Sequence, residues 1–349
     1  MSTFSLSHPW LRSLRLAAVS LCGALSLGLM ACDDDEDTTP ATPQQNIVQV
    51  AQGNPAFSTL VAAVTKADLA GTLTGTGPFT VFAPTNDAFA RLSPPFNNAT
   101  NIAAITDASQ IATLRGILLY HVVGANVRAA DIPNGASNRT TARPASTVGG
   151  QAINDNTIYL TKSGANVFIN GRTRVVTADV AASNGTIHAI DRVLLPPSQS
   201  IAQLVIARAQ AAANPEFTFL LQALQRPAAA QILTAAGSSS ANVTVFAPTD
   251  AAFRALLGNQ PLSSVPDADL VAILSRHVIG TGRVFSSDLA PGSVTTLGGP
   301  VTVAAATTGG GFTVRGGSGT AANIGNTDAT VDILATNGVV HVIDQVIRP

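Results

Sequence analysis

Apolar positions recur along this chain with a helical period, and the same arrangement occurs twice. Two sets of four apolar residues share the spacing i, i+3, i+4, i+7: Phe57, Leu60, Val61 and Val64, and then Phe217, Leu220, Leu221 and Leu224. This spacing predicts helices with one buried face. An Asn-Pro pair precedes each set. Because Asn is a good N-cap and Pro suits the first helical position, we expect these helices to begin at Asn54 and Asn214.

A second repeated segment combines a short strand with the start of a helix. Residues 79–86 (Phe-Thr-Val-Phe-Ala-Pro-Thr-Asn) and 243–250 (Val-Thr-Val-Phe-Ala-Pro-Thr-Asp) are β-prone up to the proline, which ends the strand. The threonine after each proline is a good N-cap. We therefore expect new helices that begin at Thr85 and Thr249.

A third segment places a histidine at the end of an apolar helical stripe. Within residues 117–124 the apolar helical stripe ends at His121, and within residues 273–280 the equivalent stripe ends at His277. Each histidine directly precedes a short β-prone stretch, so both are expected at a junction between a helix and a strand.

A fourth segment places another histidine in a strand. Residues 184–191 and 337–344 both begin with Asn-Gly, which is a strong signal for a hairpin turn. The β-prone strand that follows carries His188 in the first copy and His341 in the second.

The four segments occur in the same order in two stretches, 46–196 and 200–349. A recurrence of this length indicates repeated domains, and 349 residues are enough for about two of them. We therefore expect two tandem domains joined by the short connector 197–199.

The first 45 residues have a different character. Residues 1–31 have the pattern of an export signal, with two arginines before an apolar run that is short for a membrane span. The run ends in Leu-Met-Ala-Cys, which resembles a bacterial lipobox and predicts lipid attachment at Cys32. An ordinary cleaved signal and a short membrane anchor are the alternatives. Residues 32–45 are rich in Asp, Thr and Pro and are expected to form a disordered tether.

Composition narrows the functional classes. Only 11% of residues are charged and the formal net charge is −1, so no basic field is present that would attract nucleic acid. The two cysteines, Cys22 and Cys32, both precede the repeats. The domains therefore have neither a disulfide framework nor a cysteine-based metal site.

Together the four segments resemble the fasciclin domain family, through the Thr-Val-Phe-Ala-Pro-Thr phrase, the Tyr-His pair and the closing Asn-Gly-x-x-His-x-Ile-Asp. The resemblance implies an α+β fold in which a twisted β-sheet wedge or sandwich is covered on one side by helices. It also implies an extracellular adhesion or matrix module without catalytic activity. The second copy has Arg276 where the first copy has Tyr120. If the aromatic ring belongs to an interaction surface, that surface is in doubt in the second domain.

The histidines are the sharpest candidates for chemistry. Apart from His8 in the leader, the chain contains only His121, His188, His277 and His341, all at repeat-equivalent positions. One hypothesis is a metal site or a general base in each domain. Two histidines per domain lack the third ligand that zinc requires, however, and no nucleophile motif is present. We expect buried, hydrogen-bonded histidines, with no catalytic residue, cofactor or metal.

A further candidate comes from the resemblance alone. An Asp-Ile segment has been tied to cell attachment in animal members of the family, and this chain has Asp332-Ile333 before its last hairpin and Asp179-Val180 at the equivalent position. The alternative is that the apolar residue packs in the core while the aspartate shapes the turn.

These observations lead to one functional expectation and two rivals. We expect a non-enzymatic adhesion, matrix or biofilm interaction protein that is exported and lipid-anchored at the outer membrane or cell surface. Its partner would be a surface protein or polysaccharide, and it would contact the membrane only through its lipid. The rivals are a carrier that holds a small hydrophobic ligand between helices and sheet, and a periplasmic structural partner of another envelope protein.

Overall fold

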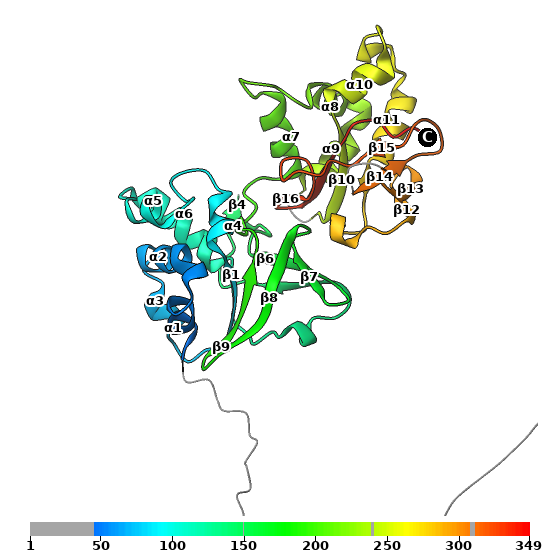
Figure 1. Cartoon of the computed structure of the whole chain (residues 1–349). Coiled ribbons are helices and arrows are strands. Elements are labelled where there is room, and N and C mark those ends of the chain that lie inside the picture. Colours follow the sequence, from blue (N-terminus) through cyan, green and yellow to red (C-terminus); the bar gives the residue numbers. More distant parts are fainter. Residues whose placement is uncertain (1–44, 149, 239–240, 308–310) are drawn as a thin grey trace, which may run out of the picture. The chain divides into compact units, whose positions relative to one another are not determined.

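The first repeat consists of a group of helices followed by a long sheet (Figure 1). The computed structural model describes residues 45–148, 150–238, 241–307 and 311–349. The predicted leader and all but the last residue of the predicted tether lie outside these ranges. The helices of the first repeat are α1 Ile47–Gln52, α2 Ser58–Lys66, α3 Ala70–Leu73, α4 Asn86–Ala90, α5 Ala99–Ala103 and α6 Ala108–Leu119. Its strands are β1 Phe79–Pro84, β2 Val122–Val123, β3 Gly135–Thr140, β4 Thr147–Val148, β5 Gln151–Ala152, β6 Thr157–Ser163, β7 Asn166–Ile169, β8 Thr173–Ala182 and β9 Gly185–Ile190.

Seven of these strands form one sheet in the order β2-β1-β9-β8-β7-β6-β3. Strands β1 and β9 are parallel and pair Phe82 with His188, whereas the other neighbours are antiparallel. The hairpin predicted at Asn184 is confirmed, because β8 and β9 pair up to Ala182 and Gly185.

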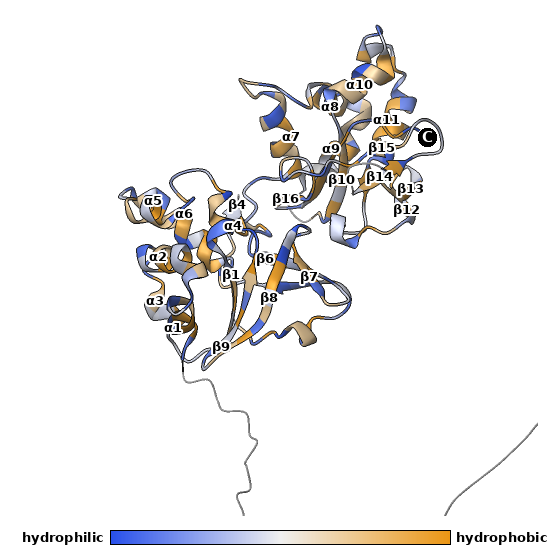
Figure 2. Ribbon diagram, viewed as in Figure 1, coloured by the Kyte–Doolittle hydropathy of each residue, from blue (hydrophilic) through white to orange (hydrophobic). Residues whose placement is uncertain are grey.

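The centre of this sheet separates two hydrophobic cores. Val81 and Ile187 point toward the helices and pack with them, whereas Phe82 and Ile190 point to the opposite side and pack with the strands β6 and β7. This division follows from the alternation of side chains along a strand. Figure 2 shows apolar and polar positions interleaved along both helices and strands, as two-sided elements of this kind require.

The second repeat has the same general order of helices and strands, although helix α5 and the paired strands β4 and β5 of the first repeat have no α-helix or strand at the equivalent place. Its helices are α7 Ile201–Ala209, α8 Thr218–Leu224, α9 Ala230–Gly237, α10 Asp250–Leu257 and α11 Asp267–Arg276. Its strands are β10 Val243–Pro248, β11 Val278–Ile279, β12 Gly292–Thr296, β13 Gly299–Ala305, β14 Phe312–Arg315, β15 Ala322–Asn323, β16 Ile333–Ala335 and β17 Gly338–Ile343. Strands β10 and β17 are parallel and pair Phe246 with His341, which matches the register of the first repeat. The predicted α+β fold is confirmed in both copies.

The main sheets of the two repeats differ in their continuity. The second repeat has two four-stranded sheets, β11-β10-β17-β16 and β12-β13-β14-β15, in place of one continuous sheet. In the first repeat the ten-residue strand β8 joins both halves. Its counterpart is interrupted by the polar sequence Gly325-Asn326-Thr327-Asp328, where Thr327 and Thr330 form a local turn. The turn replaces the β-branched run of β8 and divides the sheet.

The helix starts predicted from sequence are partly corrected. Thr85 and Thr249 cap α4 and α10 as expected, by accepting hydrogen bonds from Ala88 N at 3.3 Å and Ala252 N at 3.1 Å. Asn54 caps a short 3-10 turn before α2. The prediction for Asn214 is wrong, because this residue adopts a positive φ of 51° and α8 begins only at Thr218.

Candidate functional site

His121 and His277 lie at the end of α6 and just after α11, in fully enclosed positions. In the first repeat the Nδ1 atom of His121 bonds the carbonyl of Ile117 at 2.7 Å, and Nε2 accepts from the backbone N–H of Leu194 at 2.9 Å. A carbonyl only accepts and a backbone N–H only donates, so the proton resides on Nδ1. Through these two hydrogen bonds the ring connects the C-terminal end of α6 to the segment that follows β9.

The second repeat reproduces this arrangement. His277 contacts Ile273 O at 2.8 Å through Nδ1 and Ile347 N at 3.0 Å through Nε2. Burial lowers the pKa of both His121 and His277 from 6.5 to about 4, against a smaller opposing effect of the hydrogen bond to the carbonyl. Both rings are thus neutral at pH 7, with both nitrogens already bonded.

His188 and His341 lie on the other side of the sheet and stabilise an irregularity in the neighbouring strand. Asp179 interrupts the register of β8 with a φ of 58°, so its N–H cannot join the ladder and instead donates to His188 Nδ1 at 3.2 Å. His188 Nε2 donates to Val127 O at 2.8 Å. His341 makes the same pair of bonds, accepting from Asp332 N at 3.3 Å and donating to Val284 O at 2.8 Å.

The aspartates of the candidate adhesion segment belong to the same structural unit. Asp179 accepts from Ala129 N at 2.9 Å, and Asp332 accepts from Ser286 N at 2.6 Å, each at the start of a 3-10 turn. The side chain of Asp332 is only 2% exposed, whereas Asp179 is exposed.

Their apolar neighbours pack inward. Val180 and Ile333 are half-buried and contact the helical cores of their repeats. The carboxylate of Asp332 is therefore not presented at the surface, and this geometry favours the interpretation in which the aspartate shapes the turn.

Tyr120 is also a buried residue and not part of a surface. Its hydroxyl donates to Thr157 O at 2.7 Å, and its side chain is fully enclosed. In the second repeat Arg276 is half-buried and donates to Pro300 O at 2.9 Å. Both side chains bond the backbone of their own repeat, so the loss of the aromatic ring does not remove an exposed patch.

These contacts leave the four histidines without a free nitrogen for a ligand or proton transfer. Within the described ranges, no group of three or more His, Cys, Asp or Glu side chains is placed to hold a metal ion. The chemistry that this arrangement offers is structural: it satisfies buried backbone groups that the ladders and helices leave unpaired.

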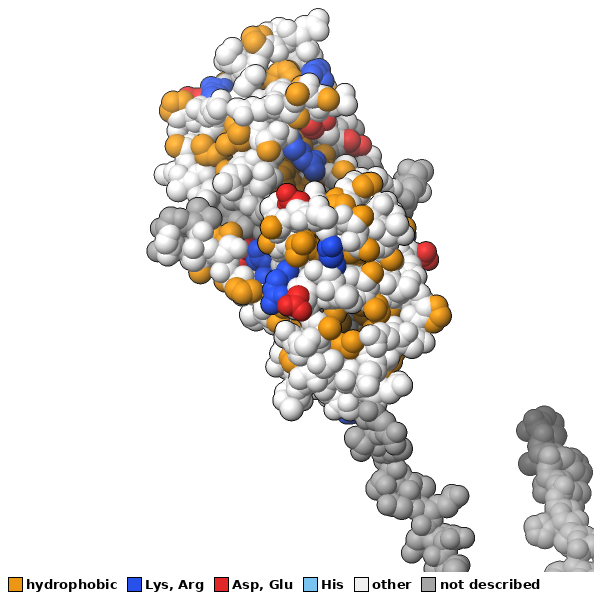
Figure 3. All heavy atoms as spheres, turned by 90° about the vertical axis from the view of Figure 1, so that its left-hand side faces the viewer, with side chains coloured by type: hydrophobic (Ala, Val, Ile, Leu, Met, Phe, Trp, Pro, Cys, Tyr) orange, Lys and Arg blue, Asp and Glu red, His pale blue; other side chains and the backbone are white. Residues whose placement is uncertain are grey.

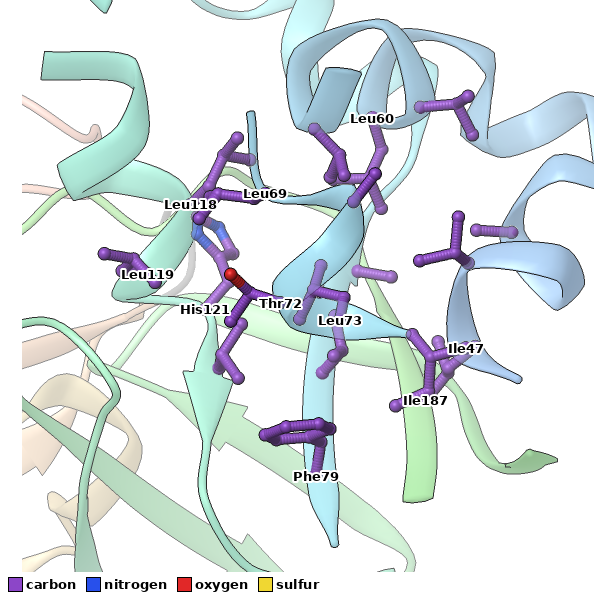
Figure 4. A pocket seen from close by; sticks show the side chains of 18 of the residues that line it. Ile47, Leu60, Leu69, Thr72, Leu73, Phe79, Leu118, Leu119, His121 and Ile187 are labelled. Carbon is purple, nitrogen blue, oxygen red and sulfur yellow. The ribbon is translucent and has the colours of Figure 1, made fainter. Parts of the chain in front are cut away.

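An apolar cavity lies between the helices and the sheet of the first repeat, which is where the carrier alternative placed its ligand, although the sequence analysis did not identify the lining residues. Its walls come from α1, α2, α3, the end of α6, β1 and β9, through side chains that include Ile47, Leu60, Leu73, Leu118 and Ile187. Figure 4 shows these side chains directed toward a common space. Each is a buried core residue by pattern, so hydrophobic periodicity does not indicate that they leave a space between them.

The cavity has about 80 Å³ of space for small molecules, which is enough for more than one water. The exposed polar residues Gln52, Thr65 and Thr72 lie among its lining residues and mark its rim. The ring of His121 also contributes to the wall, but both of its nitrogens are bonded elsewhere. The interior of the cavity therefore offers contacts with carbon atoms and almost no hydrogen bonds.

Comparison with known proteins relates both repeats to one family. A family model described as the fasciclin domain matches residues 55–196 and 215–349. Protein sll1483 of Synechocystis is 44% identical over 151 residues, which cover 43% of this chain and 73% of that protein. Stabilin-2 of Rattus norvegicus is 32% identical over 226 residues, which cover 62% of this chain and 14% of stabilin-2.

One solved structure with similarity to this chain is a FAS1 domain pair from the insect cell adhesion molecule fasciclin I. It is 18% identical, has a TM-score of 0.36, and the match covers 85% of this chain and 98% of that chain. Among the described residues of the present chain, no helix combines the length and apolar character needed to cross a membrane.

Proposed function

Because the chain belongs to the fasciclin domain family, we propose that it is a non-enzymatic adhesion or matrix-interaction protein of the cell envelope, held there by lipid on Cys32. The family is associated with cell-adhesion and extracellular-matrix proteins and is not known as a family of enzymes. The observation that carries the proposal is the presence of two copies of this domain on one chain. Two weak contacts on one chain gain by avidity when both engage the same surface.

The surface chemistry supports contacts that do not depend on charge. Figure 3 shows a face on which charged side chains are few among uncharged polar and apolar groups. Single apolar side chains project from the described surface, among them Val176, Leu195 and Leu297, which are 49%, 52% and 55% exposed. Association through such groups is expected to change little with ionic strength, unlike association steered by charge.

The anchor is tested by replacing the two cysteines one at a time. Cys32→Ala is expected to move the protein from the membrane fraction to the soluble fraction. Cys22→Ala is the matched control, because Cys22 lies inside the predicted signal and is expected to be removed with it. An unchanged membrane fraction for Cys32→Ala would contradict the lipid anchor.

The adhesive function is tested by protease treatment of intact cells, followed by detection of the protein with an antibody. We expect digestion of the protein while periplasmic marker proteins survive, because an adhesion protein must face outward. Protection until the outer barrier is opened would rule out adhesion to external surfaces. That result would favour an inward-facing partner of another envelope protein.

A further inference from the structure

We infer that the apolar cavity of the first repeat is a binding site for the alkyl chain of a small, uncharged amphiphile. The site is independent of the proposed surface contacts, because its walls are the helix-facing side chains of the sheet and the sheet-facing side chains of the helices. Neither the family match nor the proposed adhesion assigns a ligand to this space.

The side chains that line the cavity favour an apolar ligand. Ile47, Leu60, Leu73, Leu118 and Ile187 present aliphatic carbon, and no Asp, Glu, Lys or Arg side chain lines the space. A water inside a protein needs about two to four polar partners, which this interior does not provide. An empty apolar space lacks the dispersion contacts of a close-packed core, so hydrocarbon is the matching occupant.

The polar residues at the rim of the cavity indicate the kind of head group that the ligand has. Gln52, Thr65 and Thr72 are exposed and offer an amide and two hydroxyls beside the apolar interior. These groups can exchange hydrogen bonds with hydroxyls or an ester, but they supply no charge to neutralise an ionic head group. A neutral head on an alkyl chain fits both the rim and the interior.

The short helix α3 provides the route of entry. It has only four residues, Ala70–Leu73, and it contributes Ala70, Thr72 and Leu73 to the lining. A single helical turn has few internal hydrogen bonds. Outward movement of α3 would admit a ligand, and it must break the hydrogen bond that Asn184 donates to Leu73 O at 2.8 Å.

The second repeat suggests how the cavity can be filled without disturbing the fold. Ile47 and Ile201 donate to the equivalent residues Asn184 and Asn337, so α1 and α7 are in register and Ala51 corresponds to Val205. A second pair of bonds aligns α2 with α8. Thr59 N donates to Asn86 in the first repeat, and Phe219 N donates to Asp250 in the second. Val61 therefore corresponds to Leu221. Both Ala51 and Val61 line the cavity. The substitutions Ala51→Val and Val61→Leu thus introduce the larger side chains that the second repeat already has at these positions.

The test uses the full chain with Cys32→Ala, so that no attached lipid competes, and monobutyrin as the probe, because its short acyl chain matches a space of about 80 Å³. Calorimetric titration is expected to give one bound monobutyrin per chain, and glycerol, the head group alone, is expected not to bind. The double variant Ala51→Val/Val61→Leu should bind at least about tenfold more weakly and melt at a higher temperature, because the same space is filled by side chains. Val176→Leu is the matched control, since it adds the same methylene at a site that is 49% exposed, and it should bind as the parent does.

Absence of binding by the parent chain would overturn the inference, and so would equal binding by the parent and the double variant. If the double variant does not fold, methyl NMR of the parent locates the probe. Shifts confined to the methyl groups of Ile47, Leu118 and Ile187 support the site, and shifts only at other methyl groups overturn it.

Discussion

Asn184 accepts a hydrogen bond at 3.0 Å from the backbone N–H of Ile47, although the two residues are separated by 137 positions in the sequence. The side-chain amide of Asn184 also donates to the carbonyls of Leu73 and Gly75, both at 2.8 Å. One residue in the β8–β9 turn therefore joins the start of α1 to the end of α3. In the second repeat, Asn337 accepts from Ile201 N at 2.9 Å in the same way.

The substitution Asn184→Ala is expected to destabilise the first repeat strongly. It leaves one buried donor and two carbonyls without their partner, which corresponds to about 2–4 kcal/mol in the free energy of unfolding. Urea unfolding of the variant and the parent measures this difference. Asn166→Ala is the control, because Asn166 is exposed on β7, and it should change the free energy of unfolding by less than about 0.5 kcal/mol. Equal small effects of both substitutions would show that the Asn184 contacts contribute little.

The buried histidines make the protein sensitive to acid in a defined range. The pKa of His121 and of His277 is lowered from 6.5 to about 4 by burial. Above pH 6.5 both native and unfolded rings are neutral, and these residues add no pH dependence. Between pH 6.5 and about 4 the unfolded chain binds protons that the native rings do not. The free energy of unfolding should therefore fall by up to about 3 kcal/mol per histidine as the pH is lowered through this range.

Urea unfolding at several pH values, combined with one variant, separates this effect from the carboxylates. His277→Gln keeps an oxygen that can accept from Ile347 N but does not titrate. It should remove about half of the part of the slope between pH 6.5 and 4 that His121 and His277 contribute, while the carboxylate part remains. Proton NMR gives an independent check, because the rings of His121 and His277 should remain neutral at pH 5 in the folded protein. Midpoints near 6.5 for both rings would contradict their burial.

Local elements were predictable because their signals are contained in short stretches. The strand before Pro84, the cap at Thr85 and the hairpin at Asn184 each depend on neighbouring residues, and the structure contains all three. The fold class was predictable because two copies of the same order of segments restrict the alternatives. The start of α8 was not, because the acceptor for Phe219 N is Asp250, which lies 31 positions away and takes the role expected of Asn214.

The candidate site was less predictable than the fold. The sequence located all four histidines and suggested that they are buried, but it did not identify their backbone partners, which lie up to 73 positions away. The lining residues of the cavity were also not identified from the sequence. A space of about 80 Å³ is a small difference between the volume enclosed by helices and sheet and the volume of the side chains that fill it. Hydrophobic periodicity identifies the face of an element that is buried but not how completely that face is packed.

Tyr120 should not ionise while the protein is folded. Tyr120 and Tyr159 are the only tyrosines in the chain, and burial raises the pKa of both hydroxyls above the usual 10.0. In a Tyr159→Phe variant, tyrosinate absorbance from Tyr120 is therefore expected to rise only together with the loss of circular dichroism during alkaline titration. Absorbance that rises near pH 10 in this variant while its circular dichroism is native would contradict the enclosed position of Tyr120.

Replacement of Asp332 by asparagine should be tolerated better at neutral pH than replacement by alanine. Burial raises the pKa of the Asp332 carboxyl, with smaller opposing effects of His341 and of the hydrogen bonds from Ser286. A raised native pKa means that the residue contributes most stability below its unfolded pKa and loses that contribution as the pH rises through the native pKa. Asp332→Asn keeps an acceptor for Ser286 N without a buried charge, so its free energy of unfolding at pH 7 should equal or exceed that of the parent.

Asp332→Ala instead leaves the N–H of Ser286 without its acceptor, which should cost about 1–3 kcal/mol at any pH. Urea unfolding of the three proteins at pH 7 and pH 4 separates these effects. Any advantage of asparagine over the parent should shrink at pH 4, because protonation removes the charge from the aspartate as well. If asparagine were as damaging as alanine at pH 7, the charge of Asp332 and not only its oxygen would be required. The turn between Ser286 and Asp332 would then depend on the ionised carboxylate, which accepts from both the N–H and the hydroxyl of Ser286.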